Sequence, residues 1–179
     1  MSGVSIMDKQ VGGACRAGRV IGLSHSGTRL VLPAPADNLI VNGGFEQGLT
    51  GWKKIGTGSV LTPSISSGSI NTPHSGNAWY RGDSANGGVS QTVAVSPGSR
   101  YCLDFWHAVG QGNSWRTATA TVTAGDAVVA SAKTPNRADT QWYEVTLDFS
   151  APKDCTAVTV TITENTWLRL DDVSLTEIL

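Results

Sequence analysis

The sequence predicts an all-β protein, built as an antiparallel β-sandwich, and three observations lead to this class. The chain is 40% hydrophobic and only 15% charged, which is typical of a globular domain. Hydrophobic and polar residues alternate along several short segments, and each segment ends in a cluster of Gly, Pro, Asn or Ser. No segment of helical length has an apolar stripe with a 3.6-residue period.

The alternating segments define ten expected strands. They lie near residues 38–42, 58–61, 78–81, 89–95, 100–108, 117–123, 127–132, 142–149, 157–163 and 167–176. This number suits two packed sheets, and an antiparallel jelly roll is the expected topology. Successive side chains of a strand point to opposite faces of its sheet, so the two faces can be separated from the sequence.

The segment 100–108 shows this separation most clearly. Its alternate hydrophobic residues Tyr101, Leu103 and Phe105 are expected in the core, with Cys102, Asp104 and Trp106 on the opposite face. A second inward row is expected in segment 142–149. That row consists of Tyr143, Val145, Leu147 and Phe149.

Residues 1–37 are predicted to form an N-terminal extended arm, and residues 38–179 the sandwich domain. Within the arm, residues 19–23 and 28–32 could pair as a hairpin, and Pro33-Ala34-Pro35 would stiffen the exit. Such a segment is too small to bury a core of its own. We therefore expect it to dock on a partner, which predicts a homo-oligomer or a larger assembly.

Charge excludes some function classes. The net charge of −1 gives no global attraction to nucleic acid or to an anionic membrane. Residues 1–35 hold four basic side chains against one acidic, a local balance of +3 that marks the arm as basic. No segment has the roughly 18 apolar residues of a membrane span, and the opening residues lack the apolar core of a secretory signal.

The three cysteines, Cys15, Cys102 and Cys155, have no metal-binding spacing. The expected interpretation is free thiols packed as small hydrophobic groups, and a bridge between Cys102 and Cys155 is the alternative.

Motifs of known catalysts are absent: the sequence has no GxSxG, no HExxH and no phosphate-binding loop. We therefore expect a protein that is not an enzyme. The tripeptide Arg81-Gly82-Asp83 could engage a receptor from a protruding loop, although an ordinary junction between strand and turn is the expected interpretation.

Several motifs together resemble the jelly-roll carbohydrate-binding modules attached to bacterial xylanases and glucanases. The resemblance covers about residues 38–179 and is most specific at its two ends. Its motifs are Asn38-Leu39, Asn42-Gly43-Gly44-Phe45-Glu46, Gly48, Gly51-Trp52, Val89-Ser90-Gln91, Pro97-Gly98, Tyr101, Trp106, Trp142 and Asp171-Asp172-Val173-Ser174-Leu175. The resemblance implies a galactose-binding-like sandwich without catalysis.

The resemblance also implies a structural calcium near the strand ends, with Glu46 and Asp172 as the matching ligand positions. Calcium prefers oxygen ligands, and backbone carbonyls of Gly-rich turns could complete its shell. The alternative is that both carboxylates bind turn amides without a metal. Asp171 is expected to face the opposite side, because adjacent strand residues alternate.

Sugar binding requires an aromatic platform with polar groups beside it. Trp106 matches the family position that lines the concave face, and Asp104 lies on the same side. The neighbouring loop adds Gln111, Asn113, Trp115 and Arg116 to the predicted site. Core or edge packing is the expected role of Trp52, Trp142 and Trp167. Trp79 departs from the family, which prefers a smaller aliphatic there.

Two functions are expected, the second as the alternative to the first. The first is a binding module for a polysaccharide or a cell-surface glycan. Since neither an enzyme domain nor an export signal accompanies the module, we expect a protein displayed on a phage virion. The second is a purely structural virion decoration or tail protein docked through residues 1–37, without sugar binding.

Overall fold

The computed structural model describes residues 37–63, 72–83, 85–109, 117–135, 141–164 and 168–178. These residues form ten strands, and no helix occurs among them. The strands are β1 (Lys53–Ile55), β2 (Gly58–Leu61), β3 (Trp79–Gly82), β4 (Gly87–Ala94), β5 (Arg100–Val109), β6 (Ala118–Ala124), β7 (Ala127–Lys133), β8 (Trp142–Ser150), β9 (Ala157–Glu164) and β10 (Leu168–Ile178).

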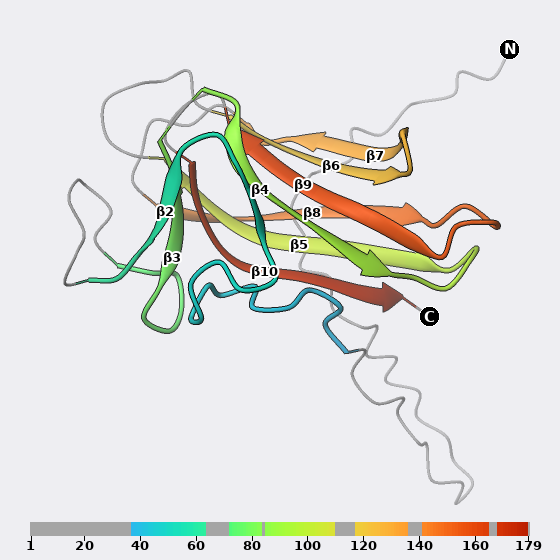
Figure 1. The fold of residues 1–179 in the computed structure, drawn as a ribbon, viewed down its shortest axis with the longest axis horizontal. Coiled ribbons are helices and arrows are strands. Elements are labelled where there is room, and N and C mark those ends of the chain that lie inside the picture. Colours follow the sequence, from blue (N-terminus) through green and yellow to red (C-terminus); the bar gives the residue numbers. More distant parts are fainter. Residues whose placement is uncertain are drawn as a thin grey trace, which may run out of the picture.

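The strands form two five-stranded sheets, and every pairing is antiparallel. The first sheet has the order β1-β4-β9-β6-β7 and the second has the order β2-β3-β10-β5-β8. Figure 1 shows them as two layers, with the short β2–β3 pair at one end. The predicted all-β antiparallel sandwich is confirmed.

The core lies between the sheets and is made of the inward side of each alternating strand. The predicted row of Tyr101, Leu103 and Phe105 is buried, with 0–1% of each residue exposed. From the first sheet, β9 adds Val158, Val160 and Ile162. Burying a side chain of this size contributes roughly 1.5–3 kcal/mol relative to exposure, so these rows dominate the stability of the fold.

One predicted strand is wrong and one strand was missed. Residues 38–42 do not form a strand, because the chain turns at Asn42 and Phe45, whose φ angles are 54° and 57°. The Asn42 side-chain amide donates to the carbonyls of Gly48 and Thr50 and fixes this turn. The missed strand is β1, which has only three residues, two of them lysine, so that alternation could not be seen.

The turn encloses an aromatic pair that joins it to the core. Phe45 is fully buried and stacks on Trp52, with the ring centroids 5.4 Å apart. The Trp52 indole nitrogen donates to the Asn42 carbonyl at 3.0 Å. The prediction that Trp52 packs in the core is confirmed.

A polar pair lies inside the sandwich. His107 of β5 and Glu164 of β9 are 3% and 2% exposed, with 3.8 Å between His107 Nε2 and Glu164 Oε1. His107 therefore faces inward, as its place in the alternation predicts.

The cysteines differ from one another. Cys155 is a free thiol, so the alternative bridge between Cys102 and Cys155 is not formed. Cys102 is disulfide-bonded, and the expectation of a free thiol there is wrong.

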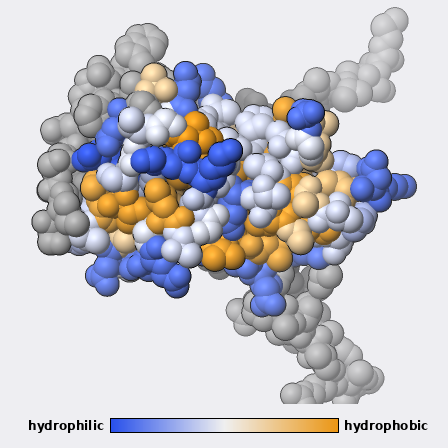
Figure 2. Space-filling view, in the orientation of Figure 1, coloured by the Kyte–Doolittle hydropathy of each residue, from blue (hydrophilic) through white to orange (hydrophobic). Residues whose placement is uncertain are grey.

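The predicted arm of residues 1–37 lies outside the described residues except for Asp37, so the arm, its hairpin and its docking role stay predictions. The described part of the chain contains no helix long and apolar enough to cross a membrane. Figure 2 shows hydrophobic side chains interspersed with hydrophilic ones on the face that it presents.

Candidate functional site

The first and last described segments meet at one edge of the second sheet. Leu39 N donates to the carbonyl of Leu175, and Asn38 Oδ1 accepts a hydrogen bond from Leu175 N. A Cβ at Gly43 would lie 1.9 Å from the carbonyl oxygen of Val173. Gly43 therefore cannot be replaced by a residue with a side chain, which explains the first glycine of the turn.

A β-bulge in β10 directs two carboxylates toward one loop. The register of β10 against β5 shifts between Asp171 and Ser174, and Asp172 adopts a left-handed φ of 47°. Because a bulge interrupts alternation, Asp171 and Asp172 both reach the loop before β3. The prediction that Asp171 faces the opposite side is wrong for this reason.

The loop in question is the segment from Thr72 to Ala78, and two aspartates hold its first part. Asp171 Oδ2 accepts from the amides of His74 at 2.8 Å and Ser75 at 3.2 Å. Asp172 Oδ2 lies 2.6 Å from His74 Nδ1, and Ser75 Oγ donates to Asp172 Oδ1 at 2.7 Å. Hydrogen bonds to charged groups contribute about 1.5–3 kcal/mol each, so the segment is firmly held.

Glu46 holds the second part of the same segment. Its Oε1 accepts from the amides of Asn77 at 2.7 Å and Ala78 at 3.0 Å. A Cβ at Gly76, whose φ is 60°, would meet this carboxylate. The turn after Asn42 is thereby linked to the loop before β3.

Burial of Asp171 changes its acidity. The residue is fully buried, and this burial, followed by the charge of Asp172, raises the pKa of Asp171 to about 7. The amides of Ser75, Asp172 and His74 act in the opposite direction, since they stabilise the charged form.

Trp106 lies on the outer face of the second sheet, as the sequence predicts. It is part-buried and does not belong to the core cluster, whereas its neighbours Phe105 and His107 are buried. The imidazole of His74 stacks on its indole, with ring centroids 3.6 Å apart and an interplanar angle of 12°. Part of the predicted sugar platform is therefore formed by a second ring.

We call this outer face the platform face. Directly opposed residues of antiparallel strands lie on the same face, so the strand registers identify its members. They are Trp79 and Arg81 of β3, Asp104 and Trp106 of β5, Trp142 and Glu144 of β8, and Arg169 and Asp171 of β10. Trp106 is opposed by Glu144 on one side and Asp171 on the other.

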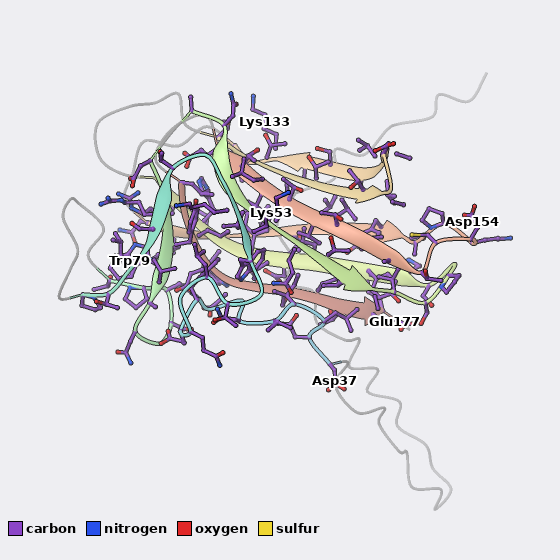
Figure 3. The ribbon with its side chains drawn as sticks, in the orientation of Figure 1. Asp37, Lys53, Trp79, Lys133, Asp154 and Glu177 are labelled. Carbon is purple, nitrogen blue, oxygen red and sulfur yellow. The ribbon has the colours of Figure 1, made fainter. Side chains whose placement is uncertain are left out.

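Two further tryptophans complete the face. Trp142 meets His74 edge-on at 6.1 Å, and its indole nitrogen donates to the Thr72 carbonyl at 3.3 Å. It lies on an edge strand, so the edge-packing interpretation holds and the core interpretation is wrong. Trp79 is fully buried, and Figure 3 places it at the β2–β3 end of the sandwich, far from Asp154.

The predicted site is only partly described. Asp104 and Trp106 share the platform face, but Gln111, Asn113, Trp115 and Arg116 lie outside the described residues, as does Trp167. The Arg81-Gly82-Asp83 motif ends β3, and its two charges pair with each other, with Arg81 Nε 2.6 Å from Asp83 Oδ1. This arrangement is the expected junction between strand and turn.

Calcium at Glu46 and Asp172 stays a prediction. Both residues lie at the predicted edge, and the hydrogen bonds of Glu46 with turn amides are those of the sequence alternative. Both oxygens of Asp172 accept hydrogen bonds or pair with His74. Among the described residues, no group of three or more His, Cys, Asp or Glu could hold a metal ion.

Sequence reasoning missed His74 and Glu144 as members of the site. The signal for His74 was weak: it is one of three histidines in the chain and stands in the Gly- and Ser-rich stretch Pro73-His74-Ser75-Gly76. Glu144 could have been found, because it alternates with the inward row of β8 and falls beside Trp106 once the two strands pair.

Comparison with solved structures shows the same fold elsewhere. TmCBM61 in complex with β-1,4-galactotriose has a TM-score of 0.61 and 20% identity, over 79% of this chain and 99% of that one. The CBM22-1–GH10 modules of Clostridium thermocellum xylanase 10B with xylohexaose have a TM-score of 0.58 and 20% identity, over 79% of this chain and 28% of that one. The enzymatically active domain of tailspike protein 4 of bacteriophage CBA120 has a TM-score of 0.56 and 15% identity, over 79% of this chain and 21% of that one.

The chain thus spans about a quarter of the xylanase chain and a fifth of the tailspike chain. Among the curated proteins compared with it, none matches. Residues 37–167, well over half of the chain, match the family described as carbohydrate binding domain. The sandwich with its aromatic outer face therefore belongs to the carbohydrate binding domain family.

Proposed function

We propose that this chain is a non-catalytic module that binds a polysaccharide or a cell-surface glycan on its platform face, with Trp106 as the main aromatic contact. The supporting observation is the position of Trp106, which projects from the outer face while its strand neighbours fill the core. An indole on an outer face can stack on the apolar side of a sugar ring.

The groups beside Trp106 supply the polar half of recognition. Glu144 opposes it on the neighbouring strand, and Asp104 lies two residues along β5. Carboxylates accept hydrogen bonds from sugar hydroxyls, and an aromatic ring with a few such groups is the usual composition of a small-ligand site. The predicted loop residues Gln111, Asn113, Trp115 and Arg116 would extend this surface.

The experiment is a titration of the chain with xylohexaose and with β-1,4-galactotriose, the ligands named for two structures of the same fold. We expect saturable heat on addition of at least one of them, and no release of reducing sugar. An absence of saturable binding to both oligosaccharides, together with no retardation in gels containing xylan or galactan, would contradict the proposal.

Display on a phage particle is a second, compatible proposal. Its support is that the tailspike of bacteriophage CBA120 contains a domain of this fold, although that likeness concerns the fold alone. Residues 1–37, with their basic balance, would dock on the assembly. Light scattering of the full chain and of a variant that begins at Asn38 tests this proposal. We expect an oligomer or larger assembly only with the arm, and the same number of subunits in both chains would contradict it.

A further inference from the structure

The platform face carries an aromatic ring that comes from a loop rather than from a strand. His74 stacks in parallel on Trp106 at 3.6 Å and also meets the edge of Trp142 at 6.1 Å. The imidazole therefore covers part of the indole, at about the separation at which a sugar ring would stack. A ligand that approaches Trp106 from this side meets His74.

The segment around His74 is built to stay in place. Buried Asp171 accepts hydrogen bonds from the amides of His74 and Ser75, and Asp172 pairs with the side chains of the same two residues. Glu46 accepts hydrogen bonds from two amides further along the segment, those of Asn77 and Ala78. Opening the segment would break all of these hydrogen bonds. Stacking of one sugar ring on Trp106 is too weak to compensate for the loss of these hydrogen bonds, so a ligand would not displace His74. His74 therefore belongs to the surface that a ligand encounters.

The imidazole also keeps a polar atom for the ligand. Its Nδ1 is used by Asp172, but its Nε2 makes no hydrogen bond with any described residue, and 28% of the side chain is exposed. When Nδ1 donates to Asp172 in the neutral imidazole, Nε2 accepts a hydrogen bond, and in the imidazolium Nε2 donates one. His74 thus combines a flat ring with an adjacent polar atom, which is the combination that sugar recognition requires.

We propose that His74 is a sugar-contacting residue, with Trp106 and Trp142 as the rings that support it and Nε2 as its hydrogen-bonding atom toward a sugar hydroxyl. The inference rests on the proposed function of the platform face. It assigns direct ligand contact to a loop residue that neither the strand pattern nor the predicted site contains.

The first test compares three variants by titration with xylohexaose and β-1,4-galactotriose. His74→Ala removes the ring and should lower affinity about tenfold, whereas His74→Phe keeps the stack and should recover part of it. Ser75→Ala is the matched control, since it removes a hydrogen bond to Asp172 from the same segment but leaves the ring. We expect Ser75→Ala to bind like the unchanged chain.

The second test separates contact from a merely structural role. In the unchanged chain, the ring nitrogen resonance of His74 Nε2 should shift on addition of the bound oligosaccharide, with the same midpoint as the titration. Normal affinity of His74→Ala, or equal losses in His74→Ala and Ser75→Ala with no shift of Nε2, would overturn the inference. Failure of the unchanged chain to bind either oligosaccharide would instead refute the proposed function on which it rests.

Discussion

The two outer faces of the sandwich arise from the same alternation but present opposite chemistry. On the first sheet, the strand registers align hydroxyl side chains, and Thr92 and Thr159 are hydrogen-bonded at 2.8 Å. We call this the hydroxyl face. Between β6 and β9 the aligned pairs are Thr119 with Thr163, Thr121 with Thr161, and Thr123 with Thr159.

The platform face of the second sheet places tryptophans, carboxylates and arginines at the corresponding outward positions. It is also the face against which a loop is fixed, through Asp171 and Asp172. Short hydroxyl side chains keep the outer face of a sheet hydrated but offer few specific contacts to a ligand. Large aromatic rings and charged groups can contact a ligand in a defined orientation. The contrast supports the proposal that the platform face, rather than the hydroxyl face, binds the glycan.

The largest expected effect comes from a change between the faces. Leu103→Ala removes a fully buried side chain from the core and should lower the free energy of unfolding by about 2–5 kcal/mol, because a cavity remains. Urea unfolding followed by tryptophan fluorescence measures this. A loss below about 1 kcal/mol would show that Leu103 is not closely packed.

A change on the platform face should affect binding and leave the fold intact. Trp106→Ala should weaken binding of the oligosaccharide about 30-fold or more, since buried aromatic contacts at ligand sites are worth about 2 kcal/mol or more. Calorimetric titration measures the affinity, and the unfolding midpoint is the control. Unchanged affinity would remove Trp106 from the site.

The hydrogen bonds of Glu46, which link the turn after Asn42 to the loop before β3, should make a moderate contribution to the free energy of unfolding. Glu46→Gln keeps an oxygen acceptor for the amides of Asn77 and Ala78 but removes its charge, and should lower the free energy of unfolding by about 1 kcal/mol. Thermal unfolding measures the change. A loss near zero would mean that solvent replaces these bonds at no cost.

The predicted calcium gives a smaller and separable effect. If Glu46 and Asp172 hold the ion, a chelator should lower the unfolding midpoint of the unchanged chain, and added calcium should restore it. Glu46→Gln should lose this response. A midpoint that is the same with chelator and with calcium would contradict the prediction.

The smallest effect is expected on the hydroxyl face. Thr121→Ala, the matched control for Trp106→Ala, should change stability by less than about 0.5 kcal/mol and affinity not at all, because surface positions of this kind make few specific contacts. The same titration and unfolding experiments apply. Reduced sugar binding in this variant would contradict the distinction between the two faces.

The sequence allowed the alternation, and therefore the sheets and the core rows, to be predicted. In the parts of the strands around Leu103 and Val160, every second residue is apolar and lies in the core. This two-residue period can be recognised from neighbouring residues in the sequence alone. The error at residues 38–42, where a strand was expected, arose because the turn at Asn42 is fixed by a side chain that binds carbonyls six and eight residues away.

The site was predictable to the extent that it follows strands. Trp106 and Asp104 follow from the alternation of one strand, but His74 reaches Trp106 through contacts with Asp171 and Asp172 nearly a hundred residues later in the chain. A bulge and a left-handed residue bring both aspartates to the loop. No local pattern encodes a contact of this kind.

An amide NMR titration of the isotope-labelled chain with xylohexaose and β-1,4-galactotriose tests the central claim most directly. We predict shifts in β5, in β8 and in the segment from Thr72 to Ala78, with β4, β6 and β9 unchanged. Shifts confined to the hydroxyl face, or none with either oligosaccharide, would contradict a glycan site on the platform face.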